Sequence, residues 1–176
     1  MWIVIDGYNL IRRSPRLSLL DRRDMEEGRD ALLATLSAYR RIKGHRITVV
    51  FDGWERGGTS EQVTLTAGLQ VVFTRRGEPA DQAILRFVGK APSGAVVVTS
   101  DRALADDVAR TGAVTLSAEE FEARLDHALR GNNEDEFRKE EDDDSDSEWP
   151  GPHRRKGPTR RPSRQTKRRI TTLKRL

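Results

Sequence analysis

The segment Trp2–Asp6, with the sequence WIVID, decides the fold class, because four apolar residues run without polar alternation into an aspartate. The pattern returns in Ile47–Asp52 (ITVVFD) and in Ala95–Asp101 (AVVVTSD). Strands that are covered on both faces have such sequences, and they belong mainly to parallel sheets flanked by helices. The carboxyl ends of parallel strands lie along one edge, where open α/β sheets bind their ligands. We therefore expect the three terminal aspartates to share one crevice.

The segments between these strands predict a sheet that alternates with helices. Gly7-Tyr8-Asn9 is expected to form a turn, and an apolar stripe predicts a helix from about Asp24 to Lys43. The other expected elements are strands at Gln62–Thr66, Leu69–Thr74 and Ala113–Leu116, and helices from about Pro79, at Arg102–Thr111 and from Ser117 to about Leu129. This order predicts a three-layer α/β/α fold with a central, mainly parallel sheet.

Charge divides the chain near Asn133. Residues 134–148 carry ten acids and two bases, whereas residues 149–176 carry eleven bases and no acid. Such blocks of like charge bury too little apolar surface to offset the entropy of the chain. We expect one globular domain, residues 1–133, followed by a disordered tail, residues 134–176, that is acidic and then basic.

Cysteine is absent, which excludes disulfides and thiolate metal sites and fits a reducing cytosol. No apolar stretch is long enough to cross a membrane, and the first strand lacks the features of a signal peptide. We expect a cytoplasmic protein without a membrane partner.

Three aspartates are the expected catalytic and metal-binding core: Asp6, Asp81 and Asp101. Asp6 ends the first strand, Asp101 follows the fourth, and Asp81 lies in the first turn of the helix after the third, so all three are expected at the same edge. Carboxylates that lie close together repel one another, and Mg²⁺ or Mn²⁺ binds such oxygen ligands. For Asp81 or Asp101 alone, a helix cap is an equally simple explanation.

Neighbouring polar residues have two interpretations each. Asp52 ends a strand as Asp6 does and is an auxiliary catalytic acid in this scheme, but Asp52-Gly53 is also an ordinary turn sequence. Asn9 is placed to bind a carboxylate or a phosphate, or to close the turn after Asp6. Ser100 offers a supporting hydroxyl beside the third aspartate, or serves the backbone.

Arginines follow the strand ends and would surround the acidic residues with positive charge, an arrangement that suits RNA. In the domain they are Arg12, Arg13, Arg75, Arg76 and Arg102, and in the tail the same role is expected for Arg154, Arg155, Arg160 and Arg161. Tyr8 and Trp54 are expected to offer aromatic surfaces for bases.

In order and spacing, these segments resemble the YacP-like branch of the NYN ribonucleases, which are related to PIN domains. The matching segments are Ile3–Ile11, Gly28–Leu33, Val49–Gly53, Val71–Thr74, Glu78–Asp81 and Val98–Asp101. The resemblance implies a metal-dependent endoribonuclease that hydrolyses RNA phosphodiesters. Positions that match the acidic motifs of the family are Asp6, Asp81 and Asp101, and Asn9, Asp52 and Glu78 match its supporting polar positions.

Some members of that family are thought to cut messenger RNA in association with the ribosome, and the resemblance implies the same partners here. Two other functions stay open. One is an RNA- or ribosome-binding module whose acidic pocket is vestigial. The other is a metal-dependent phosphatase for small molecules, although Tyr8 stands where the commonest such enzymes carry a second aspartate.

Overall fold

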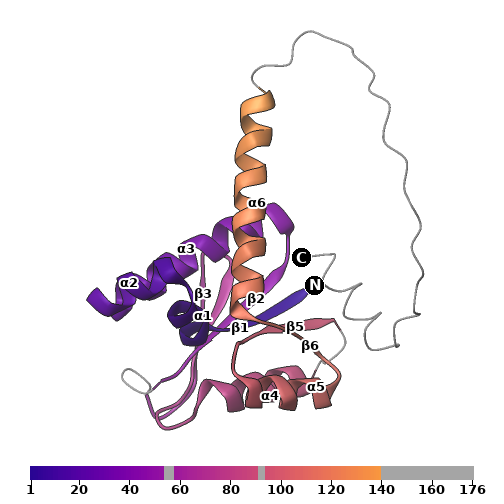
Figure 1. The fold of residues 1–176 in the computed structure, drawn as a ribbon. Coiled ribbons are helices and arrows are strands. Elements are labelled where there is room, and N and C mark those ends of the chain that lie inside the picture. The colour runs from indigo at the N-terminus through magenta and orange to yellow at the C-terminus, as the bar shows by residue number, and fades with distance from the viewer. Residues whose placement is uncertain (54–57, 91–93, 140–176) are drawn as a thin grey trace, which may run out of the picture.

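In the computed structural model, a six-stranded sheet lies between two layers of helices (Figure 1). The structure describes residues 1–53, 58–90 and 94–139, with the side chains described up to residue 131. Its strands are β1 (Trp2–Asp6), β2 (Arg46–Phe51), β3 (Gln62–Thr66), β4 (Leu69–Phe73), β5 (Ala95–Val98) and β6 (Val114–Leu116). The helices are α1 (Gly7–Arg13), α2 (Pro15–Arg23), α3 (Met25–Lys43), α4 (Ala80–Lys90), α5 (Arg102–Thr111) and α6 (Ala118–Lys139).

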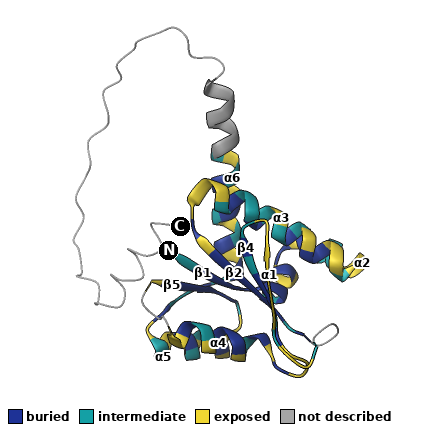
Figure 2. Ribbon diagram, turned by 180° about the vertical axis from the view of Figure 1, so that it is seen from behind, coloured by how far each residue is buried: buried dark blue, intermediate teal, exposed yellow. Residues whose placement is uncertain are grey.

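The strand order is β3-β4-β2-β1-β5-β6, and only the β3–β4 pair is antiparallel. Within each central strand, alternate side chains enter two separate cores. Ile3 and Ile5 of β1 pack with α1, α2, α3 and α6, whereas Val4 packs with α4 and α5. Figure 2 shows the central strands buried and the outer faces of the helices exposed. The predicted three-layer α/β/α fold is confirmed.

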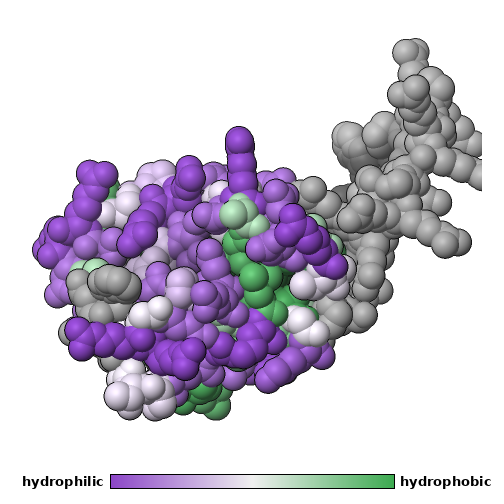
Figure 3. Space-filling model, turned by 90° about the horizontal axis from the view of Figure 1, so that it is seen from below, coloured by the Kyte–Doolittle hydropathy of each residue, from purple (hydrophilic) through white to green (hydrophobic). Residues whose placement is uncertain are grey.

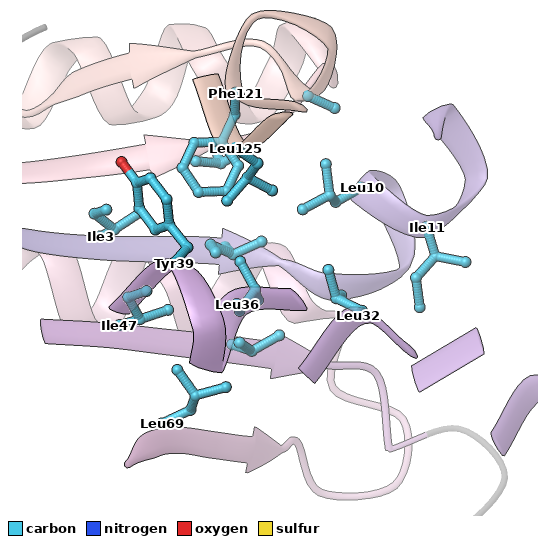
Figure 4. Packing of buried hydrophobic residues seen from close by; sticks show 14 of the residues in the cluster. Ile3, Leu10, Ile11, Leu32, Leu36, Tyr39, Ile47, Leu69, Phe121 and Leu125 are labelled. Carbon is cyan, nitrogen blue, oxygen red and sulfur yellow. The ribbon is translucent and has the colours of Figure 1, made fainter. Parts of the chain in front are cut away.

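The larger core lies on the side of the sheet that carries α3 and α6 (Figure 4). Leu32, Leu36 and Tyr39 of α3 are fully buried there, and the Tyr39 ring lies edge-on to Phe121 of α6, with 5.7 Å between the centroids. On the other side, α4 and α5 cover the smaller core. Figure 3 views that layer from outside: its surface is mainly hydrophilic, and the hydrophobic residues form a narrow band.

Two boundaries differ from the expected ones. The turn expected at Gly7-Tyr8-Asn9 is the first part of helix α1, which begins at Gly7 because the Asp6 side chain caps it. Ser14 then caps α2, which has Pro15 in its first turn. Helix α6 ends at Lys139 and not near Leu129, so it runs past the expected domain boundary at Asn133. Most of the expected tail, residues 140–176, lies outside the described residues.

Among the described residues, no helix has both the length and the hydropathy of a membrane-spanning segment.

Candidate active site

The strand order places β2, β1 and β5 side by side and parallel, so the residues that follow them lie along one edge of the sheet. Those residues include Asp52, Asp6 and Asp101. Helix α4 follows β4 and carries Asp81 in its first turn. In the β1 strand, Asp6 has the same parity as Val4, whose side chain packs against α4 and α5. The site therefore lies at the carboxyl edge, on the α4 side of the sheet.

Asp6 is the most buried acid of this group, with 9% of its surface exposed. It caps α1, and its Oδ1 accepts a hydrogen bond of 3.1 Å from the backbone N–H of Asn9. The pKa of Asp6 is raised to about 7, mainly by burial; the hydrogen bond from Asn9 and the charge of Arg12 lower it, and the negative charges of Asp81 and Asp52 raise it. The chain thus holds a carboxyl group where its ionised form is unfavourable.

Asp81, in the first turn of α4, also has a raised pKa. Burial raises its pKa, and so do, in decreasing order, the charges of Asp101, Asp52 and Asp107. Asp81 therefore senses both strand-end aspartates on either side of Asp6, and Asp6 senses Asp81 and Asp52 in turn. Together with the strand order, these influences place four aspartates, Asp6, Asp52, Asp81 and Asp101, in one region of the carboxyl edge. We call them the acidic group.

Asp107 of α5 is the residue that sequence reasoning missed, since a mid-helix acid there suggests only a solvated surface. It also forms an ion pair with Arg110. A signal was present: α5 buries Leu104 and Val108, and Asp107 is adjacent to Val108, at the border of the buried face.

Asp101 is a helix cap as well as a member of the acidic group. Its Oδ1 accepts a 3.0 Å bond from the N–H of Leu104, and its own N–H donates to the Thr99 hydroxyl at 3.1 Å. The side chain is exposed. Capping and ligation are therefore compatible for this residue, because a carboxylate has a second oxygen free to face the edge.

Asn9 connects the two strand ends that carry Asp6 and Asp101. While its N–H donates to Asp6, its side-chain Oδ1 accepts a 2.8 Å bond from the N–H of Ser100. One residue thus fixes the α1 start relative to the loop before α5. Of the expected roles, the structure shows closure of the turn after Asp6, and the Asn9 side chain also joins that turn to the loop after β5.

Asp52 anchors α4. Its Oδ1 accepts a short bond from the N–H of Ala80, the first residue of that helix. Thr74 strengthens the junction, since its hydroxyl accepts from Gly53 N–H at 2.8 Å and donates to the Glu78 carbonyl at 2.6 Å. The turn after β2 therefore positions the helix that carries Asp81.

The Ser100 hydroxyl faces α6. It donates to Glu119 Oε2 at 2.8 Å and accepts from the N–H of Ala118 at 3.0 Å. A pocket of about 420 Å³ opens beside it, lined by Asp101, Arg102 and Arg13 among others. The Ser100 hydroxyl thus joins the acidic edge to α6, partly through a backbone N–H, and its partner Glu119 was not foreseen.

Glu78 is placed differently from the supporting position that the resemblance implied. It is buried, with 8% exposed, and its carboxylate binds Arg86 and, at 3.3 Å, Arg75. Arg86 also pairs with Glu61. The backbone turns at Gly77, whose φ is +82°, and Glu78 is committed to these arginines. Through these ion pairs, Glu78 stabilises the segment before α4. It is not among the acids whose charges raise the pKa of Asp6 or Asp81.

The expected RNA-binding arginines have different surroundings. Arg12 lies 5.6 Å from the centroid of the Tyr8 ring, Arg13 is 3.9 Å from Glu119, and Arg102 lines the pocket beside Asp101. Arg75 is paired with Glu78, as described above, and Arg76 is exposed. The tail residues Arg154, Arg155, Arg160 and Arg161 lie outside the described residues, as does Trp54.

Tyr8 cannot stack on a base as expected, because it is 8% exposed and packs edge-on against Phe51, with 5.1 Å between centroids. Its hydroxyl accepts a 2.8 Å bond from Arg29 and donates to the Met25 sulfur at 3.1 Å. Gly7 allows this packing, since a Cβ there would lie 2.3 Å from the Phe51 ring. Tyr8 belongs to the core.

The acidic group fits a divalent cation in its chemistry, because hard carboxylate oxygens suit Mg²⁺ and Mn²⁺ and a cation relieves the repulsion that raises both pKa values. Within the described ranges, however, no three His, Cys, Asp or Glu side chains converge as a ready-made metal cage. This combination suits an ion that keeps part of its water shell, as Mg²⁺ commonly does.

Known proteins share the sequence pattern and the fold of this chain. A family model, YacP-like NYN domain, matches residues 3–156 and so extends past Asn133 into the expected tail. The uncharacterized protein YacP of Bacillus subtilis (strain 168) is 36% identical over 87 residues, which are 47% of this chain and 48% of that protein. The alignment therefore spans about half the length of that curated relative.

Two crystal structures of Rae1 (YacP) from Bacillus subtilis have similar folds. One, of a mutant, has a TM-score of 0.66 and 25% identity, and covers 99% of this chain and 96% of that chain. The other has a TM-score of 0.66 and 30% identity, with 79% and 80% covered. The resemblance that the sequence motifs suggested is thus confirmed over nearly the whole chain, which belongs to the YacP-like NYN domain family, a nuclease-type family.

Proposed function

We propose that this protein is an endoribonuclease that uses Mg²⁺ or Mn²⁺ to hydrolyse RNA phosphodiester bonds. The main support for the proposal is the acidic group at the carboxyl edge of the sheet, where burial and the charges of neighbouring aspartates raise the pKa of Asp6 and of Asp81. A fold gains nothing from crowding four carboxylates unless a cation or a proton neutralises them. Membership of a nuclease-type family also supports hydrolysis of a nucleic acid.

In this proposal Asp6, Asp81 and Asp101 hold the ion. When bound, the ion neutralises charge on the phosphate and lowers the pKa of a bound water. Asn9 keeps Asp6 and the Asp101 loop in register, and Asp52 fixes the start of α4 beneath Asp81. Both are positioning residues, since their hydrogen bonds go to the backbone.

The RNA backbone is held by arginines around the acidic group. Arg13 and Arg102 line the pocket beside Asp101, and Arg12 lies near enough to Asp6 to lower its pKa. Positive charge around a negative centre lets the polyanion approach the ion without direct contact between phosphates and carboxylates. For the basic tail we propose salt-sensitive binding to RNA on the ribosome, through Arg154, Arg155, Arg160 and Arg161.

One observation favours a second candidate, a non-catalytic module that binds RNA or the ribosome. In the part of the chain that the structure describes, no three acidic or histidine side chains are already arranged around one ion. A vestigial site would have that property. The two candidates differ in one respect that can be measured, which is whether the acidic group supports turnover.

The test uses end-labelled single-stranded RNA, alone and on ribosomes, incubated with the full chain in Mn²⁺, in Mg²⁺ or in EDTA. Asp81→Asn and Asp101→Asn remove one carboxylate charge each, and Asp106→Asn, on the exposed side of α5, is the matched control. We expect cleavage in Mn²⁺ or Mg²⁺ by the wild type and by Asp106→Asn only. Equal RNA binding by all four proteins without any metal-dependent cleavage would favour the binding module.

A further inference from the structure

A second pocket, of about 350 Å³, lies between α3 and the edge of the sheet formed by β3 and β4. Its lining includes Arg29, Asp30 and Leu33 of α3, Thr64 and Thr66 of β3, and Phe73 of β4. The aromatic and aliphatic residues belong to the α3 side of the sheet, because Val71 and Phe73 pack with that core. The acidic group lies on the α4 side, so this pocket is a separate site.

Arg29 is the unusual residue of this pocket. It is 8% exposed, and its Nη1 donates a 2.8 Å bond to the Tyr8 hydroxyl. Its guanidinium carbon lies 5.9 Å from the centroid of the Phe73 ring. Among the described residues, no carboxylate forms an ion pair with Arg29. A guanidinium has five N–H donors, so the bond to Tyr8 leaves others for an acceptor in the pocket.

A buried charge without an ionic partner is costly unless hydrogen bonds satisfy it. The guanidinium therefore indicates a place for acceptor atoms. A phosphate is a poor candidate, because the carboxylate of Asp30 lines the same pocket and would repel a second negative charge. The ligand should be neutral, and it should offer acceptors to Arg29 and donors to the Asp30 carboxylate.

The other residues that line the pocket indicate the shape of the ligand. Leu33, Val71 and Phe73 supply an apolar surface, and Thr64 and Thr66 supply hydroxyls from the opposite wall. A flat heterocycle would cover the apolar surface and present its polar edges to the walls.

We propose that this pocket binds a guanine base. Guanine presents O6 and N7 together as acceptors, which arginine binds with two parallel hydrogen bonds, and its N1–H and amino group are donors for a carboxylate. Adenine has an amino donor in place of O6, so it would meet the guanidinium with the wrong polarity. Charge balance, shape and the free donors of Arg29 thus select the same ligand.

The pocket is connected to the acidic group through Tyr8. Its hydroxyl binds Arg29, its ring packs on Phe51, and its backbone lies two residues after Asp6. If the proposed nuclease function is correct, the guanine would be a base of the substrate RNA. Binding of guanine itself does not depend on that function.

The first experiment measures binding of guanosine, adenosine and inorganic phosphate to the full chain by calorimetry. NMR follows the amide signals of Thr64 and Thr66 to locate the bound ligand. We expect saturable binding of guanosine, binding of adenosine that is about ten- to a hundredfold weaker, and no phosphate-induced shift at these amides. Equal binding of the two nucleosides, or no binding of guanosine, would overturn the inference.

Two substitutions on β3 form a matched pair. Thr64→Tyr places a ring inside the pocket, whereas Leu65→Tyr places the same ring on the opposite face of the strand, where Leu65 is 79% exposed. We expect the first to weaken guanosine binding at least about tenfold and the second to leave it unchanged. Equal loss in both would also overturn the inference. Both are tyrosines on an exposed edge strand, where that residue type is favoured, so folding should be kept.

A third arm separates the sources of the base. Guanosine 5′-monophosphate, a GpA dinucleotide and an ApA dinucleotide are compared in the Asp101→Asn protein, so that no cleavage interferes. Stronger binding of GpA than of the mononucleotide indicates guanine in RNA, whereas the reverse indicates the free nucleotide. Guanosine binding without RNA cleavage would leave this inference standing and remove the proposed function, and cleavage without guanosine binding would do the opposite.

Discussion

Replacing Asp6 by asparagine is expected to stabilise the metal-free protein at pH 8. The folded protein raises the pKa of this carboxyl from 3.8 to about 7, mainly through burial. Below pH 3.8 the group is mainly protonated in the folded and unfolded states alike, so it does not lower the free energy of unfolding. As the pH rises toward 7, only the unfolded state ionises freely, and the free energy of unfolding falls by up to roughly 4 kcal/mol. Above pH 7 the loss stays constant.

Asparagine removes the titrating group and keeps the hydrogen bond to Asn9, because asparagine also caps helices well. The free energy of unfolding is measured in urea at pH 4 and pH 8 with EDTA present. We expect the variant to match the wild type at pH 4 and to exceed it at pH 8 by about 2–4 kcal/mol, the range allowing for relaxation around the charge.

Asp24→Asn is the control, because Asp24 also caps a helix but is exposed. Its difference from the wild type should not grow between pH 4 and pH 8 as the Asp6 difference does. If Asp6→Asn were equally or less stable than the wild type at pH 8, the argument that this site stores unfavourable charge would be refuted.

Three further substitutions test other parts of the account. Gly7→Ala should lower the free energy of unfolding by about 1–3 kcal/mol, because the added methyl group meets the Phe51 ring; no loss in a urea titration would show that the ring is free to move. Arg86→Met should cost about 1–2 kcal/mol by leaving buried Glu78 with a single partner, and the double variant with Glu78→Gln should recover part of that loss in the same assay. Asn9→Ala should remove about 1 kcal/mol of stability but most of the metal-dependent RNA turnover, so an unchanged turnover would contradict its positioning role.

The sequence predicted those features that depend on local pattern. The apolar runs that end at Asp6, Asp52 and Asp101 indicated adjacent parallel strands, and the strand order confirms that β2, β1 and β5 are neighbours. Strand burial leaves a strong signal, because most residues of such a strand must be apolar. The common edge follows from the direction of parallel strands alone.

Features that depend on tertiary contacts could not be predicted in the same way. Glycine and asparagine suggest a turn at Gly7-Tyr8-Asn9, but packing of Gly7 on Phe51 and capping by Asp6 favour a helix there. Glu78 is three residues from Asp81, yet it is bound by Arg86, eight residues farther along the chain. Only the turn at Gly77 and the position of α4 bring that pair together, and neither is visible in the spacing of residues.

The acidic group shows an intermediate case. Asp6, Asp52 and Asp101 could be predicted from strand ends, and Asp81 from the start of a helix. The effect of Asp107 on the pKa of Asp81, in contrast, depends on the rotation of α5 against α4. Roles that appeared to be alternatives also coincide: Asp6 and Asp101 cap helices while they face the edge, and Asp52 holds α4 by its backbone. Capping fixes a carboxylate in place, which favours ligation.

Whether the acidic group holds a metal ion can be measured by adding Mn²⁺ to the full chain and following the loss of the electron paramagnetic resonance signal of free Mn²⁺. The wild type and Asp106→Asn are expected to bind the ion with the same affinity, and Asp81→Asn to bind it at least about tenfold more weakly, since that substitution removes one of the negative charges that would attract the cation. Equal affinity in all three proteins, or no binding at millimolar Mn²⁺, would contradict the claim that the acidic group holds a metal ion.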